Sequence, residues 1–204
     1  MGTARRRGGA RRTGARARYT ALDVRDEQAL RNELDCVREE LGPITGIVHG
    51  AGVLADARIE DKSPDQFTRV FDTKVGGLHA LLSATRQDPL RLICAFSSIV
   101  GFTGNDGQCD YAMANETLNQ VLAAEQAARP HALVRALLWG PWRGGMVTPE
   151  LQDLFDLAGV DTIPLDQGAR AFADELRYPA DDPRVVITAG AAAALLTEVP
   201  IATR

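Results

Sequence analysis

Features typical of secreted, membrane-spanning or metal-binding proteins are scarce in this 204-residue sequence. It has only three cysteines, Cys36, Cys94 and Cys109, and no Cys-x-x-Cys pair, so we expect neither structural disulfides nor a metal site. No apolar run approaches the length of a membrane span, and no apolar stretch follows the first arginines as it would in a secretory signal. These absences favour a cytoplasmic protein that has no membrane partner.

Acidic residues are absent from residues 1–18, which contain seven of the 23 basic residues and otherwise only Gly, Ala, Thr and Met. Such a segment cannot form a core, so we expect disorder there. It could be a basic arm for RNA or another anion, but it has no aromatic side chain on which bases could stack, which favours a linker or incidental translated sequence. The remaining residues carry 16 basic against 27 acidic groups, a poor balance for binding nucleic acid.

Strand-like and helix-like patterns alternate along the rest of the chain. Helix signals include Gly42-Pro43 as a stop, Ser63 with Gln66 as a capping box, and Thr148 and Asp166 as N-caps. The helix that contains Tyr111 should end before Pro130. The patterns predict strands over 19–24, 44–52, 90–98, 132–140 and 184–190, with helices over 25–41, 63–85, 111–128 and after Thr148 and Asp166.

This alternation, with short connections, predicts an α/β protein with a doubly wound parallel sheet and helices on both faces. Ligands of such sheets bind beyond the carboxyl ends of the strands. Three predicted strands end in distinctive residues: Gly50-Ala51-Gly52, Ser97-Ser98 and Gly140-Pro141-Trp142. We therefore expect the functional site at this edge of the sheet.

Four polar side chains could perform carbonyl chemistry there. Tyr111 and Asn115 are four residues apart, which places them on one helix face about 6 Å apart along the axis. Ser98 ends a strand that faces the start of this helix, and Lys74 lies near the edge of the buried face of the preceding helix, where it either reaches solvent or enters the site. A tyrosine whose pKa is lowered by an ammonium can donate a proton, and a serine hydroxyl can hold a carbonyl oxygen.

Each of these residues also has an ordinary structural explanation. A helix-start tyrosine, a strand-end serine, a surface lysine and a polar helix residue are common when taken singly. Their combination with glycines after the strand ends favours reduction of a carbonyl group, for which a nicotinamide cofactor supplies the hydride.

The stretches "GPITGIVHGAGVLAD", "FDTKVGGLHAL", "FSSIVGFTGNDGQCDYAMANETLNQV" and "WGPWRGGM" make the sequence resemble the ketoreductase domain of polyketide synthases, within the short-chain dehydrogenase/reductase superfamily. The resemblance covers residues 19–190, leaving 191–204 as a tail. It implies a Rossmann-like fold and NADPH-dependent reduction of a β-ketoacyl group on an acyl carrier protein, alongside other synthase domains, in polyketide or fatty acid biosynthesis.

The resemblance also implies residue roles. Tyr111 would be the acid, Ser98 the carbonyl-binding hydroxyl, and Lys74 and Asn115 the rest of a catalytic tetrad. Leu54-Ala55-Asp56 retains the last aspartate of a Leu-Asp-Asp motif that marks one stereochemical type, and Thr103 stands where the opposite type has tryptophan. The implied cofactor-binding residues are Asp23, Val24, Gly50, Ala51, Gly52, Pro141 and Trp142, and the implied substrate residues are Asp56, Gln108 and Met146.

One part of the family pattern is missing before Tyr19: a strand that leads through a Gly-x-Gly-x-x-Gly turn into a helix, where the cofactor pyrophosphate would bind. The predicted strand over 19–24 would then lack its neighbour, and the strand over 44–52 would have an exposed edge. We therefore expect the C-terminal part of a ketoreductase domain. An alternative is an inactive or partial domain that complements another polypeptide.

Overall fold

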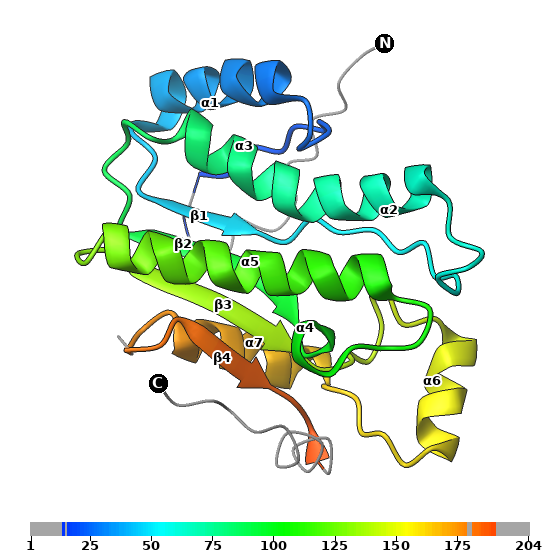
Figure 1. Cartoon of the computed structure of the whole chain (residues 1–204). Coiled ribbons are helices and arrows are strands. Elements are labelled where there is room, and N and C mark those ends of the chain that lie inside the picture. Colours follow the sequence, from blue (N-terminus) through cyan, green and yellow to red (C-terminus); the bar gives the residue numbers. More distant parts are fainter. Residues whose placement is uncertain (1–13, 15, 179–180, 191–204) are drawn as a thin grey trace.

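The computed structural model describes residues 14, 16–178 and 181–190, and within these the predicted parallel α/β architecture is confirmed (Figure 1). Four strands form one sheet in the order β1-β2-β3-β4, and each neighbouring pair is parallel. The central strands have seven residues each, whereas the edge strands have four. The strands are β1 (Gly46–His49), β2 (Leu92–Ser98), β3 (Leu133–Trp139) and β4 (Arg184–Ile187).

Helices cover both faces of this sheet because β2 and β3 are apolar on both sides. On one face, Ile93 and Ala136 pack with Leu118 of α5 in the larger core cluster. On the other face, Leu137 lies in a second cluster with Phe172 of α7 packed against it. The described helices are α1 (Glu27–Leu41), α2 (Pro64–Phe71), the π-helix η2 (Asp72–Gly76), α3 (Gly77–Ala84), α4 (Val100–Thr103), α5 (Cys109–Ala128), α6 (Pro149–Leu157) and α7 (Leu165–Glu175).

Two predicted helix caps are confirmed and one is wrong. Ser63 and Gln66 form the reciprocal capping box at α2, and the Thr148 hydroxyl accepts from the backbone N–H of Leu151 at α6. Asp166 does not cap α7, whose N-cap is Pro164. Its carboxylate instead forms an ion pair with Arg170 one turn further along the helix.

The strand predicted over residues 19–24 does not form. Its alternating pattern is adequate, but no described strand lies beside it to supply ladder hydrogen bonds. The segment instead packs through Val24, which lies close to Gly77 of α3 and to the His49 ring. A β-carbon added at Gly77 would lie 2.8 Å from a Val24 methyl group, so glycine allows this close approach.

Most of the segments 1–18 and 191–204 fall outside the described residues. Within the described part, Arg18 forms ion pairs with Glu33 and Glu40 of α1, with N···O distances of 2.7 and 3.0 Å. Arg16 donates to the backbone carbonyl of Glu40 at 3.2 Å. The last basic residues of the arginine-rich segment therefore lie along an acidic side of α1.

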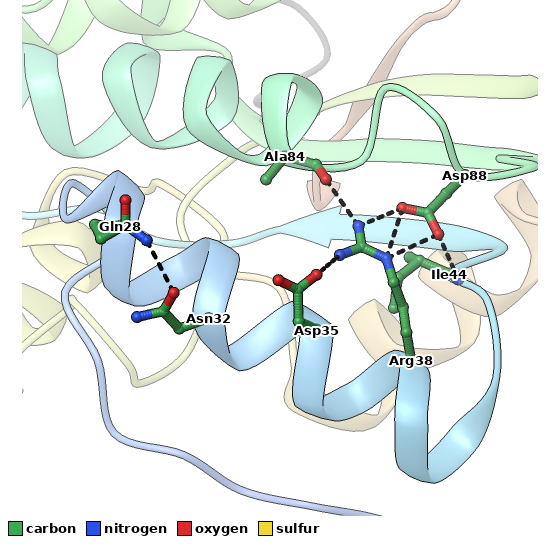
Figure 2. A network of polar contacts seen from close by, with 7 residues as sticks. All are labelled: Gln28, Asn32, Asp35, Arg38, Ile44, Ala84 and Asp88. Carbon is green, nitrogen blue, oxygen red and sulfur yellow. Dashed lines mark hydrogen bonds and ion pairs between the residues drawn. The ribbon is translucent and has the colours of Figure 1, made fainter.

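A network centred on Arg38 joins α1 to the end of α3 and to the chain entering β1 (Figure 2). The guanidinium donates to both carboxylate oxygens of Asp88 and to the carbonyl of Ala84, and it also contacts Asp35. Asp88 additionally accepts from the backbone N–H of Ile44 at 3.0 Å. Ala84 and Asp88 are thereby held to Arg38 and Ile44, which lie more than 40 positions earlier in the chain.

Strand β1 lies at an edge of the described sheet, as the sequence analysis predicted. Its burial alternates, because Ile47 and His49 are buried whereas Gly46 and Val48 are exposed. The Val48 side chain is 46% exposed, which is unusual for an apolar residue in a parallel sheet. In the described part of the chain, no helix is long and apolar enough to cross a membrane.

Candidate active site

The four candidate catalytic residues come from three elements that meet at the carboxyl edge of the sheet. Ser98 is the last residue of β2, and its register partner Trp139 is the last residue of β3. Tyr111 and Asn115 lie one turn apart in the first half of α5, which runs across β2 and β3 (Figure 1). Lys74 comes from η2, which also contacts α5.

Lys74 enters the site instead of reaching solvent, which settles the two possibilities left open by the sequence. The residue is only 4% exposed, and its Nζ donates to the backbone carbonyl of Phe96 at 3.0 Å. The amine lies 5.2 Å from the centroid of the Tyr111 ring. Burial lowers the pKa of Lys74 to about 8.

Lys74 lies in the π-helical turn η2, and its side chain packs beside Gly52. A π-helix widens one helical turn and often occurs at functional sites. A β-carbon added at Gly52 would lie 3.3 Å from Cε of Lys74, so a larger residue there would crowd the lysine side chain. The glycine after β1 therefore contributes space to the site.

The pKa of Tyr111 is raised, mainly because the phenol is buried. Hydrogen bonds from the side chains of Ser98 and Asn115 act in the opposite direction, and the charge of Asp56 raises the pKa further. The expectation that Lys74 lowers this pKa is not confirmed. Its amine lies 5.2 Å from the ring centroid and donates to the Phe96 carbonyl, and it is not among the groups that shift this pKa.

Ser98 and Asn115 are both buried and partly bonded to backbone groups. The Ser98 hydroxyl accepts from the N–H of Val100 at 3.2 Å and lies 3.5 Å from the carbonyl of Trp139. The Asn115 amide donates to the carbonyl of Tyr111 at 2.8 Å. Its Oδ1 atom is buried and has no hydrogen-bond partner among the described residues, so this acceptor can take a further hydrogen bond.

Of the residues expected near the cofactor, Gly50, Ala51 and Gly52 follow β1 directly and lie at the same edge of the sheet as Ser98. A β-carbon added at Gly50 would meet no atom within 4 Å, so the space beside it is open.

Asp23 and Val24, also expected near the cofactor, make contacts within the protein. Asp23 forms an ion pair with Arg25, which lowers the pKa of its carboxyl group to about 2. Val24 packs against Gly77.

Pro141 and Trp142 are held toward α7. The carbonyl of Pro141 accepts from the N–H of Ile163 at 2.8 Å. The Trp142 ring lies 4.6 Å from the ring of Trp139 and directly against Gly168, where an added β-carbon would lie 2.2 Å from it. Trp142 thus packs against the second core cluster, on the face of the sheet opposite α5.

Two of the three expected substrate residues are brought together. The Gln108 amide donates to the Asp56 carboxylate at 2.8 Å, and the charge of Asp56 raises the pKa of Tyr111. Met146 lies on the loop after β3 and is 45% exposed. Sequence reasoning missed a further pair, Lys62 and Asp110, which are buried beside this site and 48 positions apart.

The described residues fit one end of a nicotinamide cofactor. The open space at Gly50 and the unpaired Oδ1 of Asn115 leave room and hydrogen-bonding capacity beside Lys74 and Tyr111. The glycine-rich turn that would hold a pyrophosphate is not found between a described strand and helix. Among the described residues, no group of three or more His, Cys, Asp or Glu could hold a metal ion.

Comparison with known proteins agrees with this geometry. Residues 5–144 match the model of the KR domain family. The chain is 42% identical over 161 residues to a polyunsaturated fatty acid synthase polypeptide of Thraustochytrium, covering 78% of this chain but only 6% of that protein. It is 32% identical over 188 residues to polyketide synthase ThaG of Burkholderia thailandensis, covering 89% of this chain and 3% of that protein.

The fold is also that of solved ketoreductases. A ketoreductase domain from the bacillaene assembly line superposes with a TM-score of 0.79 at 30% identity, covering 93% of this chain and 46% of that one. A short-chain dehydrogenase from Burkholderia cenocepacia, in complex with NADP, shares the fold with a TM-score of 0.74 at 20% identity, covering 89% and 79%. The chain belongs to the ketoreductase domain family of polyketide and related fatty acid synthases, within the short-chain dehydrogenase/reductase fold.

Proposed function

We propose that this chain catalyses the NADPH-dependent reduction of a β-ketoacyl thioester, carried on an acyl carrier protein, to the β-hydroxyacyl form. The observation that carries the proposal is the meeting of Ser98, Tyr111 and Lys74 at the carboxyl edge of the sheet, with Asn115 one turn beyond Tyr111. The family of the chain supports a ketoreductase, and the synthases it resembles support other synthase domains as partners.

In this proposal, Ser98 and Tyr111 both act on the substrate carbonyl oxygen. The bound nicotinamide supplies a hydride to the carbonyl carbon. The Ser98 hydroxyl donates a hydrogen bond to the oxygen as negative charge develops there, and Tyr111 transfers its phenolic proton to that oxygen. The C=O double bond becomes a C–O single bond, and the product is a neutral alcohol.

Lys74 and Asn115 would serve the tyrosine after this transfer. The Lys74 ammonium, 5.2 Å from the ring centroid, stabilises the phenolate that remains. The free Oδ1 of Asn115 can hold a water molecule through which the tyrosine regains a proton. The raised pKa of Tyr111 keeps the phenol protonated at neutral pH, which is the form that a proton donor requires.

The test is reduction of a β-ketoacyl thioester surrogate, followed by oxidation of NADPH. The chain should reduce the surrogate, and Tyr111→Phe, which removes only the hydroxyl, should lower kcat by about a hundredfold or more. Tyr178→Phe is the matched control because Tyr178 is 69% exposed and lies outside the site. Equal rates for wild type and Tyr111→Phe would contradict the assigned role.

A second candidate function is structural: a partial ketoreductase domain that complements another polypeptide. The observation that favours it is the edge strand β1, whose Val48 is 46% exposed. The edge of a sheet offers backbone groups for pairing with another chain, and the exposed Val48 adds apolar surface on the face beside it. This candidate predicts no turnover by the chain alone and turnover when the complementing polypeptide is added.

A further inference from the structure

A buried ion pair lies beside the candidate active site and has no part in the mechanism above. The Nζ of Lys62 is 2.8 Å from Oδ2 of Asp110, and the two side chains are 3% and 1% exposed. Among the ion pairs of the described residues, it is the one in which both side chains are this deeply buried. Burying two charges requires compensating hydrogen bonds, so the other contacts of this pair show which segments it joins.

Each partner makes a second hydrogen bond to a backbone group next to a site residue. Lys62 donates to the carbonyl of Ala55 at 2.8 Å, immediately before Asp56. Asp110 accepts from the N–H of Tyr111 at 2.8 Å through its other oxygen. That N–H lies in the first turn of α5, where backbone donors lack partners within the helix and a carboxylate is favoured.

The pair thus connects the loop of residues 53–62 to the beginning of α5. Two further bonds join the same segments: the Asp56–Gln108 side-chain bond at 2.8 Å and the bond from the Ala57 N–H to the Gly107 carbonyl at 3.0 Å. The Asp56–Gln108 bond is exposed, whereas the ion pair is shielded from water. The buried pair is therefore the side-chain connection between loop and helix with which water competes least.

We propose that Lys62 and Asp110 are positioning residues, which fix the loop carrying Asp56 against the helix carrying Tyr111 and so set the surroundings of the phenol. This inference rests on the proposed reductase function for its catalytic meaning. Without the pair, the loop would move away from α5. Tyr111 would then become more exposed, and the carboxylate of Asp56 would act on it less strongly.

The test compares two double variants that each remove a whole ion pair without leaving a buried charge. Lys62→Met/Asp110→Asn retains an amide oxygen that can accept from the Tyr111 N–H but loses the tether to Ala55. Arg38→Met/Asp88→Asn removes the Arg38–Asp88 ion pair of Figure 2 and is the matched control. The readout is the absorbance titration of tyrosinate, with Tyr111 resolved by subtracting the same titration in the Tyr111→Phe background.

This titration needs neither cofactor nor substrate, so its outcome is independent of whether the chain proves to be a reductase. We expect the midpoint of Tyr111 to fall in Lys62→Met/Asp110→Asn and to stay unchanged in the control. The same midpoint in both double variants would overturn the proposal. If the chain reduces the thioester surrogate, kcat/KM should also fall about 10- to 100-fold in the first variant. Lys62→Arg, which keeps a positive charge beside Asp110, should largely retain kcat/KM.

Single variants keep the test decisive should the double variant not fold. Asp110→Asn and Asp88→Asn each neutralise one buried carboxylate, the first beside the site and the second in the α1–α3 network. Amide hydrogen exchange over residues 55–62 should be faster in Asp110→Asn than in Asp88→Asn. Equal exchange rates in this loop would refute the tether.

Discussion

The network around Asp88 allows a sharp prediction about stability, made with the single substitution Asp88→Asn. Asp88 accepts from Arg38 of α1 and from the N–H of Ile44 at the entry to β1 (Figure 2). Its side chain is 6% exposed, so the charge is largely withdrawn from water. Asparagine has nearly the same shape, but it has no charge and only one acceptor oxygen.

The expected loss can be bounded from these contacts. Removing one partner of a fully buried ion pair costs about 3–5 kcal/mol. Arg38, however, is 27% exposed and retains its bonds to Asp35 and the Ala84 carbonyl, so it is not left uncompensated. The appropriate range is that of hydrogen bonds to charged groups, about 1.5–3 kcal/mol, which for a domain of this size corresponds to a fall in Tm of roughly 3–12 °C.

The pH dependence separates this ionic contribution from a general packing defect. The hydrogen bonds from Arg38 hold the pKa of Asp88 below its ordinary value. A depressed carboxyl pKa gives stability that is complete above the unfolded pKa, about 4, and is lost as the pH falls through the folded pKa. In urea denaturation, the difference between wild type and Asp88→Asn should be full near neutral pH and shrink in acid. A difference that is absent near neutrality, or that does not shrink, would refute the reasoning.

Three further predictions follow from other parts of the structure. Gly168→Ala should destabilise the chain by about 1–3 kcal/mol in urea denaturation, because its β-carbon would collide with the Trp142 ring. Ala169→Ser, on the exposed side of α7, is the control; Gly159→Ala is unsuitable because Gly159 has a positive φ. Leu118→Ala should lower the free energy of unfolding by about 2–5 kcal/mol, because Leu118 is fully buried between α5 and the sheet. A loss below about 1 kcal/mol, as for a surface substitution, would contradict this packing. Burial lowers the pKa of His49 to about 4, so its ring should stay neutral in an NMR titration from neutral pH down to about pH 5. Folding stability should decrease with acidification between about pH 6.5 and 4, because the unfolded state takes up the proton first.

Local signals in the sequence predicted much of the fold, because they depend on near neighbours. The capping box at Ser63 and Gln66 and the apolar run that becomes β2 each contain the information for their own element. The strand over 19–24 failed for the opposite reason, because a strand requires a partner, and none lies beside it among the described residues. Its alternating pattern could not indicate whether that partner was present.

The candidate site shows the same limit. The spacing of Tyr111 and Asn115 and the position of Ser98 at a strand end predicted that these residues would meet. Lys74 lies in a π-helical turn, which helical periodicity does not reveal. Lys62 and Asp110 come from segments 48 positions apart, so only the tertiary structure shows that they pair.

The most direct test of the reductase account is a titration of the purified chain with NADPH, followed by nicotinamide fluorescence, in parallel with the same titration of Gly52→Val. The wild-type chain should bind NADPH saturably. Binding by the variant should be weaker, because a side chain at position 52 would fill space beside Lys74. Absence of binding up to millimolar NADPH would contradict the account and favour a partial domain that another polypeptide must complete.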